Sequence, residues 1–175
     1  MDPRSWVLAV EKAYVDAAVG RHQPVGTGDL TRAAAAAGAV ASRYLAVSEP
    51  RSLALIGDDA SAQLSLAAHS VWFSPKDLRS VGNSLGRAVS LDEALAADLV
   101  CAHVPLTLAV TQLRRGTHVN ALAGAQLDAE LARLALVTHE TPGLGQLAAG
   151  IVDGRAFDEI TIFILGDAAV ARSAI

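Results

Sequence analysis

The chain has 175 residues, of which 52% are hydrophobic and 18% are charged, and its formal net charge is −4. This length and composition predict one globular domain with a sizeable core and exclude a largely disordered chain. The slight acidity argues against a nucleic-acid partner, which needs a basic patch. The longest apolar run, Ala33–Ala41, is too short to span a bilayer, and the first residues lack a signal-peptide pattern. We therefore expect a cytoplasmic protein with neither a membrane nor a nucleic-acid partner.

The N-terminal residues predict a helix followed by a linker. Apolar residues recur at helical spacing over Trp6–Val19, and residues 21–29 are rich in proline and glycine. A second helix, rich in alanine, is predicted over Thr31–Ala46. We expect residues 1–29 to form a helix and linker that extend from a main domain of residues 30–175.

Beyond this point, short apolar runs alternate with helical segments. The predicted strands are Leu53–Gly57, His69–Phe73, Leu99–His103, Thr117–Ala121, Leu134–Thr138 and Ile160–Ile164. The predicted helices are Ala60–Ala68, a short helix capped by Ser90, Thr107–Leu113, Leu127–Arg133 and Gly143–Gly150. Apolar strands without clean alternation, separated by helices, indicate a parallel sheet covered on both faces. The predicted fold class is α/β, a Rossmann-like, doubly wound and mostly parallel sheet with a small helical N-terminal extension.

Several segments resemble one protein family and occur in that family's order. The segment Gly116–Ala121 reads Gly-Thr-His-Val-Asn-Ala, which is similar to a segment of the ornithine cyclodeaminase/mu-crystallin family. Further similar segments are Arg43–Ala46, Leu53–Gly57, Ala97–Val100 and Glu159–Phe163. The resemblance implies a dimeric NAD(P)-dependent enzyme that acts on amino acids, imines or keto acids. Since little more than the family's first helix precedes the matching region, we expect the Rossmann-domain portion without most of the substrate domain.

The loop after the first predicted strand departs from the family's Gly-x-Gly-x-x-Ala pattern. It reads Gly57-Asp58-Asp59-Ala60-Ser61-Ala62, so that Asp59 replaces the second glycine. That glycine lets the backbone approach a pyrophosphate at the helix N-terminus, and a carboxylate there adds bulk and negative charge. We therefore expect Asp58 or Asp59 to cap the helix and to occupy the anion site itself. This interpretation predicts no cofactor, with NADP or NAD as the alternative.

Two further positions lie where a dinucleotide would be recognised. The second predicted strand ends in Ser74 and lacks the acid that binds the ribose of NAD. Ser74, Lys76 and Arg79 are alternatives for a 2′-phosphate of NADP, although solvated charges at a helix start are the simpler interpretation. His103 ends the next predicted strand, at the edge where open α/β sheets bind ligands, although a structural histidine is the alternative. The candidate residues of this degenerate cofactor cleft are Gly57, Asp58, Asp59, Ser74 and His103.

The catalytic residues that the resemblance implies are out of register. The family's substrate-binding arginine falls on Ala33, with Arg32 one residue early, and its catalytic aspartate falls on Ala171. We therefore predict no catalytic residue. The histidines show no close metal-ligand spacing, and Cys101 is expected to be a small buried residue, so that no metal site is predicted either.

Two hypotheses remain. The first is a cut-down relative of the family, a pseudoenzyme that acts as a binding or assembly module. The second is an NAD(P)-dependent oxidoreductase or cyclodeaminase that acts on an amino acid or imine and borrows its substrate domain from a partner chain. In both cases the apolar face of the first helix, with Trp6, Val10 and Tyr14, predicts a homodimer or a partner protein bound through the N-terminal helices.

Overall fold

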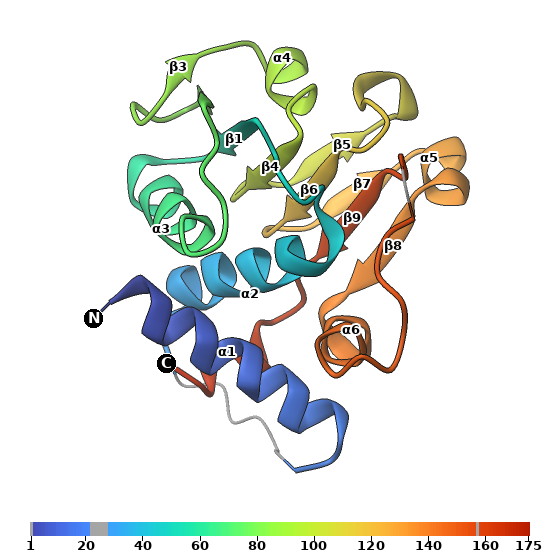
Figure 1. Ribbon diagram of the computed structural model, residues 1–175. Helices are drawn as coiled ribbons and strands as arrows, with labels where there is room; N and C mark the ends of the chain where they lie inside the picture. The colour runs from blue at the N-terminus through green and yellow to red at the C-terminus, as the bar shows by residue number, and fades with distance from the viewer. Residues whose placement is uncertain (1, 22–27, 157) are drawn as a thin grey trace.

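The computed structural model describes residues 2–21, 28–156 and 158–175 (Figure 1). The strands in this part of the chain are β1 Ser52–Ile56, β2 Asp77–Val81, β3 Arg87–Ala88, β4 Leu99–Ala102, β5 Leu106–Leu108, β6 His118–Ala121, β7 Ala125–Leu127, β8 Leu136–His139 and β9 Thr161–Ile164. The helices are α1 Pro3–Ala18, α2 Leu30–Leu45, α3 Asp59–His69, α4 Leu91–Leu95, α5 Ala129–Leu134, α6 Gly145–Ala148 and α7 Ala169–Arg172. Two short turns complete the described elements, η1 Val110–Gln112 and η2 Glu140–Leu144.

A parallel sheet of seven strands, in the order β3-β2-β1-β4-β6-β9-β8, forms the centre of the described structure. The predicted α/β, Rossmann-like fold is therefore confirmed. The direction of winding reverses beside β1, because β2 and β3 extend to one side of it and β4, β6, β9 and β8 to the other. Open parallel sheets bind ligands at the carboxyl ends of their strands beside such a reversal. The fold thus points to the carboxyl ends of β1 and β4.

Side chains of the central strands alternate between two layers. Leu53 and Leu55 of β1 belong to a buried cluster with residues of α3, on the same side as α2. Ala54 and Ile56 face the opposite layer, where they pack with residues of α4, β5 and α5. Because both faces of the sheet are covered, the strands read as nearly continuous apolar runs.

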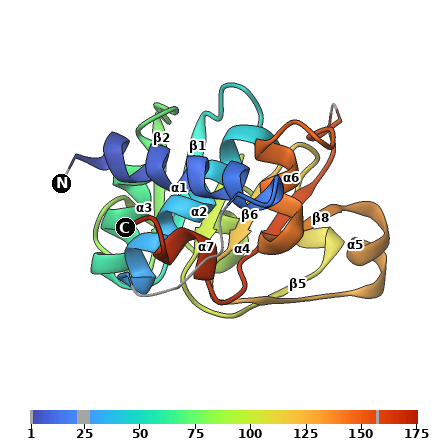
Figure 2. The same cartoon turned by 90° about the horizontal axis from the view of Figure 1, so that it is seen from below.

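The alanine-rich α2 lies directly on the sheet, between it and α1 (Figure 1), and in the view from below α1 lies in front of α2 (Figure 2). Asp29 caps this helix by accepting hydrogen bonds from the amide of Thr31 at 2.9 Å and that of Arg32 at 3.2 Å. A Cβ at Gly38 would lie 3.1 Å from Cδ2 of Leu122, which follows β6. Small side chains therefore let α2 approach the sheet closely.

The apolar face of α1 is covered by the chain itself, and the prediction that this face is exposed is wrong. Trp6, Val10 and Tyr14 are 4%, 0% and 1% exposed. They pack in one cluster with residues of α2, α6 and α7. Residues 22–27 of the predicted linker, including His22, Pro24 and Gly26, lie outside the described residues. None of the described helices is long and apolar enough to cross a membrane.

Two further predicted elements are wrong. The segment His69–Phe73 is not a strand, because α3 continues through His69 and the strand begins at Asp77. Phe73 is nevertheless buried with β1 residues, and such an apolar run packed in a turn imitates a buried strand in sequence. The segment Thr107–Leu113 is not a helix. Its start belongs to β5, which pairs with β7, and only the short turn η1 follows.

Candidate functional site

Gly57 and His103 meet where the winding of the sheet reverses. Gly57 follows β1 with φ +139°, and a Cβ built there would lie 3.1 Å from Cβ of His103 and 3.2 Å from Oγ of Ser61. The backbone amide of His103, directly after β4, donates to the carbonyl of Ile56 at 2.8 Å. Only glycine fits this conformation and this close approach.

The helix that follows Gly57 begins at the same edge of the sheet. Asp58 is its N-cap, and the Asp58 carboxylate accepts a hydrogen bond from the amide of Ser61 at 2.9 Å. This bond lowers the pKa of Asp58, so the carboxylate is ionised at neutral pH. The cap expected from the sequence is thus Asp58. The N-terminus of α3 lies at the carboxyl ends of β1 and β4, which is where open parallel sheets bind ligands in a crevice.

Asp59 does not share this role, because its carboxylate turns toward the loop after β2. Oδ1 of Asp59 accepts from the amide of Ser84 at 2.7 Å and from the Ser84 hydroxyl at 2.9 Å. These bonds lower the pKa of Asp59. Sequence reasoning missed Ser84 because it placed the second strand too early. The Gly82-Asn83 pair, which is typical of a turn after a strand, was the signal available in the sequence.

His103 is half-buried and is held by α3. Its Nε2 lies 2.7 Å from Oγ of Ser65. Burial lowers the pKa of His103, and the nearby charge of Asp58 acts in the opposite direction. Within the described part of the chain, Nδ1 of His103 makes no hydrogen bond. The imidazole thus has a fixed position and one nitrogen left for a ligand.

A buried line of hydrogen bonds continues behind His103. The backbone carbonyl of Ser65 accepts from Nδ1 of His69 at 2.7 Å, and Nε2 of His69 lies 3.0 Å from Oγ of Ser42. Burial lowers the pKa of His69 to about 4, so this imidazole is neutral. The Cys101 thiol lies 3.4 Å from the same Nε2, and burial raises the pKa of Cys101 to about 12. This pair therefore carries no thiolate nucleophile.

The family-like segment Gly116–Ala121 supplies the other end of this line. Asn120 donates through Nδ2 to Oγ of Ser42 at 2.8 Å, and its Oδ1 lies 3.1 Å from Nε2 of His118. Nδ1 of His118 lies 2.8 Å from Oγ1 of Thr161. Burial lowers the pKa of His118 to about 3. In this structure His118 and Asn120 belong to the core and do not line the crevice.

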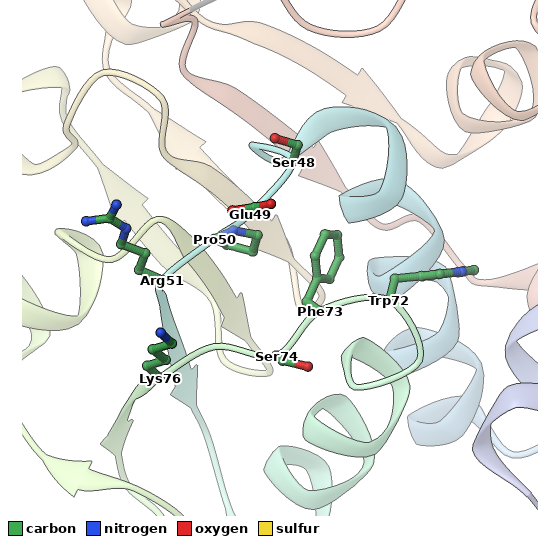
Figure 3. Close-up of a pocket in the computed structure, with 8 residues that line it drawn as sticks. All are labelled: Ser48, Glu49, Pro50, Arg51, Trp72, Phe73, Ser74 and Lys76. Carbon is green, nitrogen blue, oxygen red and sulfur yellow. The ribbon is translucent and has the colours of Figure 1, made fainter.

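Ser74 does not join the crevice. It lies between α3 and β2, beside the amino ends of β1 and β2, and lines a separate pocket of about 550 Å³. Figure 3 shows Arg51 and Lys76 on one side of this pocket and Trp72 and Phe73 on the other. The structure therefore brings Gly57, Asp58, Asp59 and His103 together and leaves Ser74 at the opposite edge of the sheet.

The positions that the resemblance implies for catalysis are part of the core. Ala33 and Ala171 are both 0% exposed. No cluster of histidine, cysteine and carboxylate side chains that could hold a metal ion occurs among residues 2–21, 28–156 and 158–175. The chemistry available at the crevice is therefore ligand binding by glycine, helix N-terminus, carboxylate and imidazole.

Solved structures share the fold of this chain. An archaeal alanine dehydrogenase dimer with bound NAD is 16% identical, with a TM-score of 0.78, and the match covers 99% of this chain and 89% of that chain. A probable ornithine cyclodeaminase from Bordetella pertussis Tohama I is 18% identical, with a TM-score of 0.75, covering 98% and 91%. The iminosuccinate reductase of Paracoccus denitrificans, in complex with NAD⁺, is 21% identical, with a TM-score of 0.67, covering 83% and 61%. No protein-family model and no curated protein matches the sequence.

These structures overturn the prediction that no cofactor is bound. The alanine dehydrogenase and the iminosuccinate reductase both hold NAD in the fold that this chain adopts. The prediction depended on Asp58 or Asp59 capping α3 and occupying the anion site. Asp58 does cap the helix by accepting from the amide of Ser61. The structure places the Asp59 carboxylate against Ser84 instead, so this second carboxylate does not compete with a pyrophosphate for the helix N-terminus.

The fold that the family-like segments imply is thus the fold that these solved structures share. Gly57 and the start of α3 occupy the loop position that the resemblance assigned to the glycine pattern. The resemblance to the ornithine cyclodeaminase/mu-crystallin family is confirmed at the level of the fold.

Proposed function

We propose that the crevice between β1 and β4 binds a nicotinamide dinucleotide, NAD or NADP. The observation that carries this proposal is the close approach of Gly57 and His103 at the reversal of the sheet. The tight turn at Gly57 brings the N-terminus of the 11-residue helix α3 to the carboxyl ends of β1 and β4, and a helix N-terminus at this place fits a pyrophosphate. The residues present therefore fit the cofactor.

Each residue of the crevice has a distinct part in this proposal. Gly57 makes the tight turn from β1 into α3, and Asp58 keeps the first turn of this helix formed. Nδ1 of His103, which makes no hydrogen bond with the residues that the structure describes, contacts the ligand, and Ser65 sets the direction of the imidazole. Asp59 stands to the side, against the loop that follows β2.

Dinucleotide binding is tested by titrating the protein with NADH. The fluorescence of NADH or the heat released in a calorimeter reports the binding. We expect saturable binding with a dissociation constant between about 1 and 100 µM. His103→Ala is expected to weaken binding, and Ser74→Ala, at the opposite edge of the sheet, is the matched control that should bind as the parent does. Absence of binding by all four forms of NAD(H) and NADP(H) at millimolar concentration would contradict the proposal.

We further propose that the reaction is the NAD(P)-dependent oxidation or reduction of an amino acid or imine. When bound, the dinucleotide supplies or accepts the hydride. The proposal is supported by the fold shared with the alanine dehydrogenase and the iminosuccinate reductase. Because Ala33 and Ala171 are apolar and buried, the groups that bind substrate and transfer its proton must come from other positions or from a partner chain.

A binding or assembly module without catalysis is the second candidate function. The same buried alanines favour it, since they replace the arginine and the aspartate that the resemblance implies for catalysis. An assay of NADH oxidation with 2-keto acids and ammonia, or with cyclic imines, separates the two candidates. Turnover that His103→Ala reduces supports the enzyme, whereas binding without turnover supports the module.

We also propose that the chain forms homo-oligomers. The support is the alanine dehydrogenase of the same fold, which is a dimer. The buried face of α1 does not supply the interface, because Trp6, Val10 and Tyr14 are covered within the chain. Sedimentation equilibrium at tens of micromolar is the test, and a pure monomer would contradict the proposal.

A further inference from the structure

One carboxylate lies beside the end of β2 without belonging to β2. In NAD-binding Rossmann folds an acidic residue at the end of β2 accepts a hydrogen bond from the ribose 2′-hydroxyl. Here the residues after β2 read Gly82-Asn83-Ser84-Leu85-Gly86, without an acid. The Asp59 carboxylate reaches this loop from the start of α3 and accepts two bonds from Ser84. A carboxylate is thus present beside the end of β2 although β2 does not supply it.

The loop after β2 is fixed against the crevice. The amide of Gly57 donates to the carbonyl of Val81 at 3.0 Å. The side-chain amide of Asn83 donates to the carbonyl of Leu55 at 2.9 Å and to that of Gly57 at 3.3 Å. Asn83 is therefore occupied with the backbone of β1, and Ser84, the next residue, holds Asp59. These bonds hold the loop after β2, and with it the Asp59 carboxylate, against Gly57.

The Asp59 carboxylate is placed to accept a further hydrogen bond. Both bonds from Ser84 use Oδ1 of Asp59. No described residue donates to Oδ2, and the side chain is exposed. A ribose hydroxyl donates hydrogen bonds, which an ionised carboxylate accepts, whereas a phosphate brings only acceptors and negative charge.

The arginines near β2 are engaged elsewhere. Nε of Arg79 binds the Asp77 carboxylate at 2.7 Å, and its Nη1 donates to the carbonyl of Glu93 at 2.7 Å. Nη2 of Arg87 binds the Glu93 carboxylate at 2.7 Å. A 2′-phosphate is usually received by such cations. Arg79 and Arg87 are thus paired with Asp77 and Glu93. The group that remains for the ribose on this side of the crevice is the Asp59 carboxylate.

From this arrangement we infer that Asp59 is the specificity-determining residue of the crevice and selects NAD over NADP by accepting from the adenosine ribose. This inference rests on the proposed dinucleotide site and adds the choice between its two ligands. The residue that sequence reasoning treated as an obstacle to the cofactor is, on this inference, the one that recognises it.

The test is a comparison of NADH and NADPH affinity in the parent protein and in Asp59→Asn. The parent is expected to bind NADH at least about tenfold more tightly than NADPH. Asp59→Asn keeps an acceptor for Ser84 but removes the charge, and it is expected to lose most of this preference. Glu49→Gln removes one charge at the separate pocket on the opposite edge of the sheet and should preserve the preference. Circular dichroism establishes that both variants are folded.

The outcomes separate this inference from the proposed function. Equal affinity of the parent for NADH and NADPH, or a preference that survives in Asp59→Asn, overturns the inference and leaves the dinucleotide site intact. Failure of the parent to bind either dinucleotide overturns both. Loss of the preference in Glu49→Gln as well as in Asp59→Asn would assign the selection to overall charge and would also overturn the role of Asp59.

Discussion

The hydroxyl of Tyr14 donates a hydrogen bond of 2.8 Å to the carboxylate of Glu140, and both residues are buried. Tyr14 lies on α1, and Glu140 follows β8 at the carboxyl edge of the sheet. The other carboxylate oxygen accepts from the amide of Ala168 at 3.0 Å, just before α7. One carboxylate thus joins the N-terminal helix to the C-terminal segment.

We expect Tyr14→Phe to lower the free energy of unfolding by about 1–3 kcal/mol, because it leaves a buried carboxylate oxygen without its donor. Urea denaturation followed by circular dichroism measures the change. Tyr44→Phe is the matched control. Tyr44 donates to Glu11 at a partly buried position where Arg43 also binds Glu11, so we expect a loss below about 1 kcal/mol. Equal losses of unfolding free energy in the two variants would contradict the prediction that the buried hydrogen bond stabilises the fold more than the partly buried one.

The same carboxylate predicts a dependence of stability on pH. Burial raises the pKa of Glu140, although the bonds from Tyr14 and Ala168 act in the opposite direction. The folded state therefore favours the protonated acid more than the unfolded state does. Its contribution to stability is complete below the unfolded pKa and is lost as the pH rises through the folded pKa. Glu140→Gln should flatten the fall in unfolding free energy that begins as the pH rises above about 4, and parallel curves for parent and variant would contradict this.

Gly57→Ala is expected to lower stability and to abolish dinucleotide binding. The backbone at φ +139° is accessible essentially to glycine alone, and the new Cβ would lie 3.1 Å from Cβ of His103. Gly124→Ala is the control, since Gly124 has φ +90° but nothing within 4 Å of a Cβ. We expect Gly124→Ala to cost about 1–2 kcal/mol and to keep binding. Calorimetry with NADH and thermal denaturation measure both effects, and retained binding in Gly57→Ala would contradict the position of the site.

Asn120 and Ser42 are expected to behave as one unit in stability measurements. Asn120→Ala removes the donor to Ser42 and leaves His118 without a partner at Nε2, which should cost about 1–3 kcal/mol. Adding Ser42→Ala should cost less in this variant than in the parent, with a coupling of about 0.5–3 kcal/mol. Additive losses in a double-mutant cycle by urea denaturation would show that the two side chains act independently.

The sequence predicted the buried strands well because burial on both faces leaves a clear apolar run. Leu53–Gly57 and Ile160–Ile164 lie within a residue of β1 and β9. The strand β2 reads Asp-Leu-Arg-Ser-Val and is only partly buried, so it carries no such run. The apolar His69–Phe73 segment took its place in the prediction. Local pattern therefore located the central strands of the sheet but not a strand toward its edge.

The parts of the candidate site that depend on residues close together in the sequence were predicted correctly in position. Gly57, Asp58 and the start of α3 follow from the loop itself, and His103 follows from the end of β4. The bond between Asp59 and Ser84 joins residues 25 positions apart, and no local pattern indicates it. The cover over Trp6 and Tyr14 likewise comes from α6 and α7, at the far end of the chain. Tertiary contacts decided both points.

The hydrogen-bonded line of side chains from His69 through Asn120 to Thr161 has a consequence for evolution. Each of these buried side chains supplies a donor or an acceptor that its neighbour needs, so a change at one position leaves an unpaired polar atom at the next. Replacing several members together by apolar side chains of matching volume removes that penalty. We therefore expect natural variants of this protein to exchange these residues as a group, and a comparison of related sequences would show them covarying.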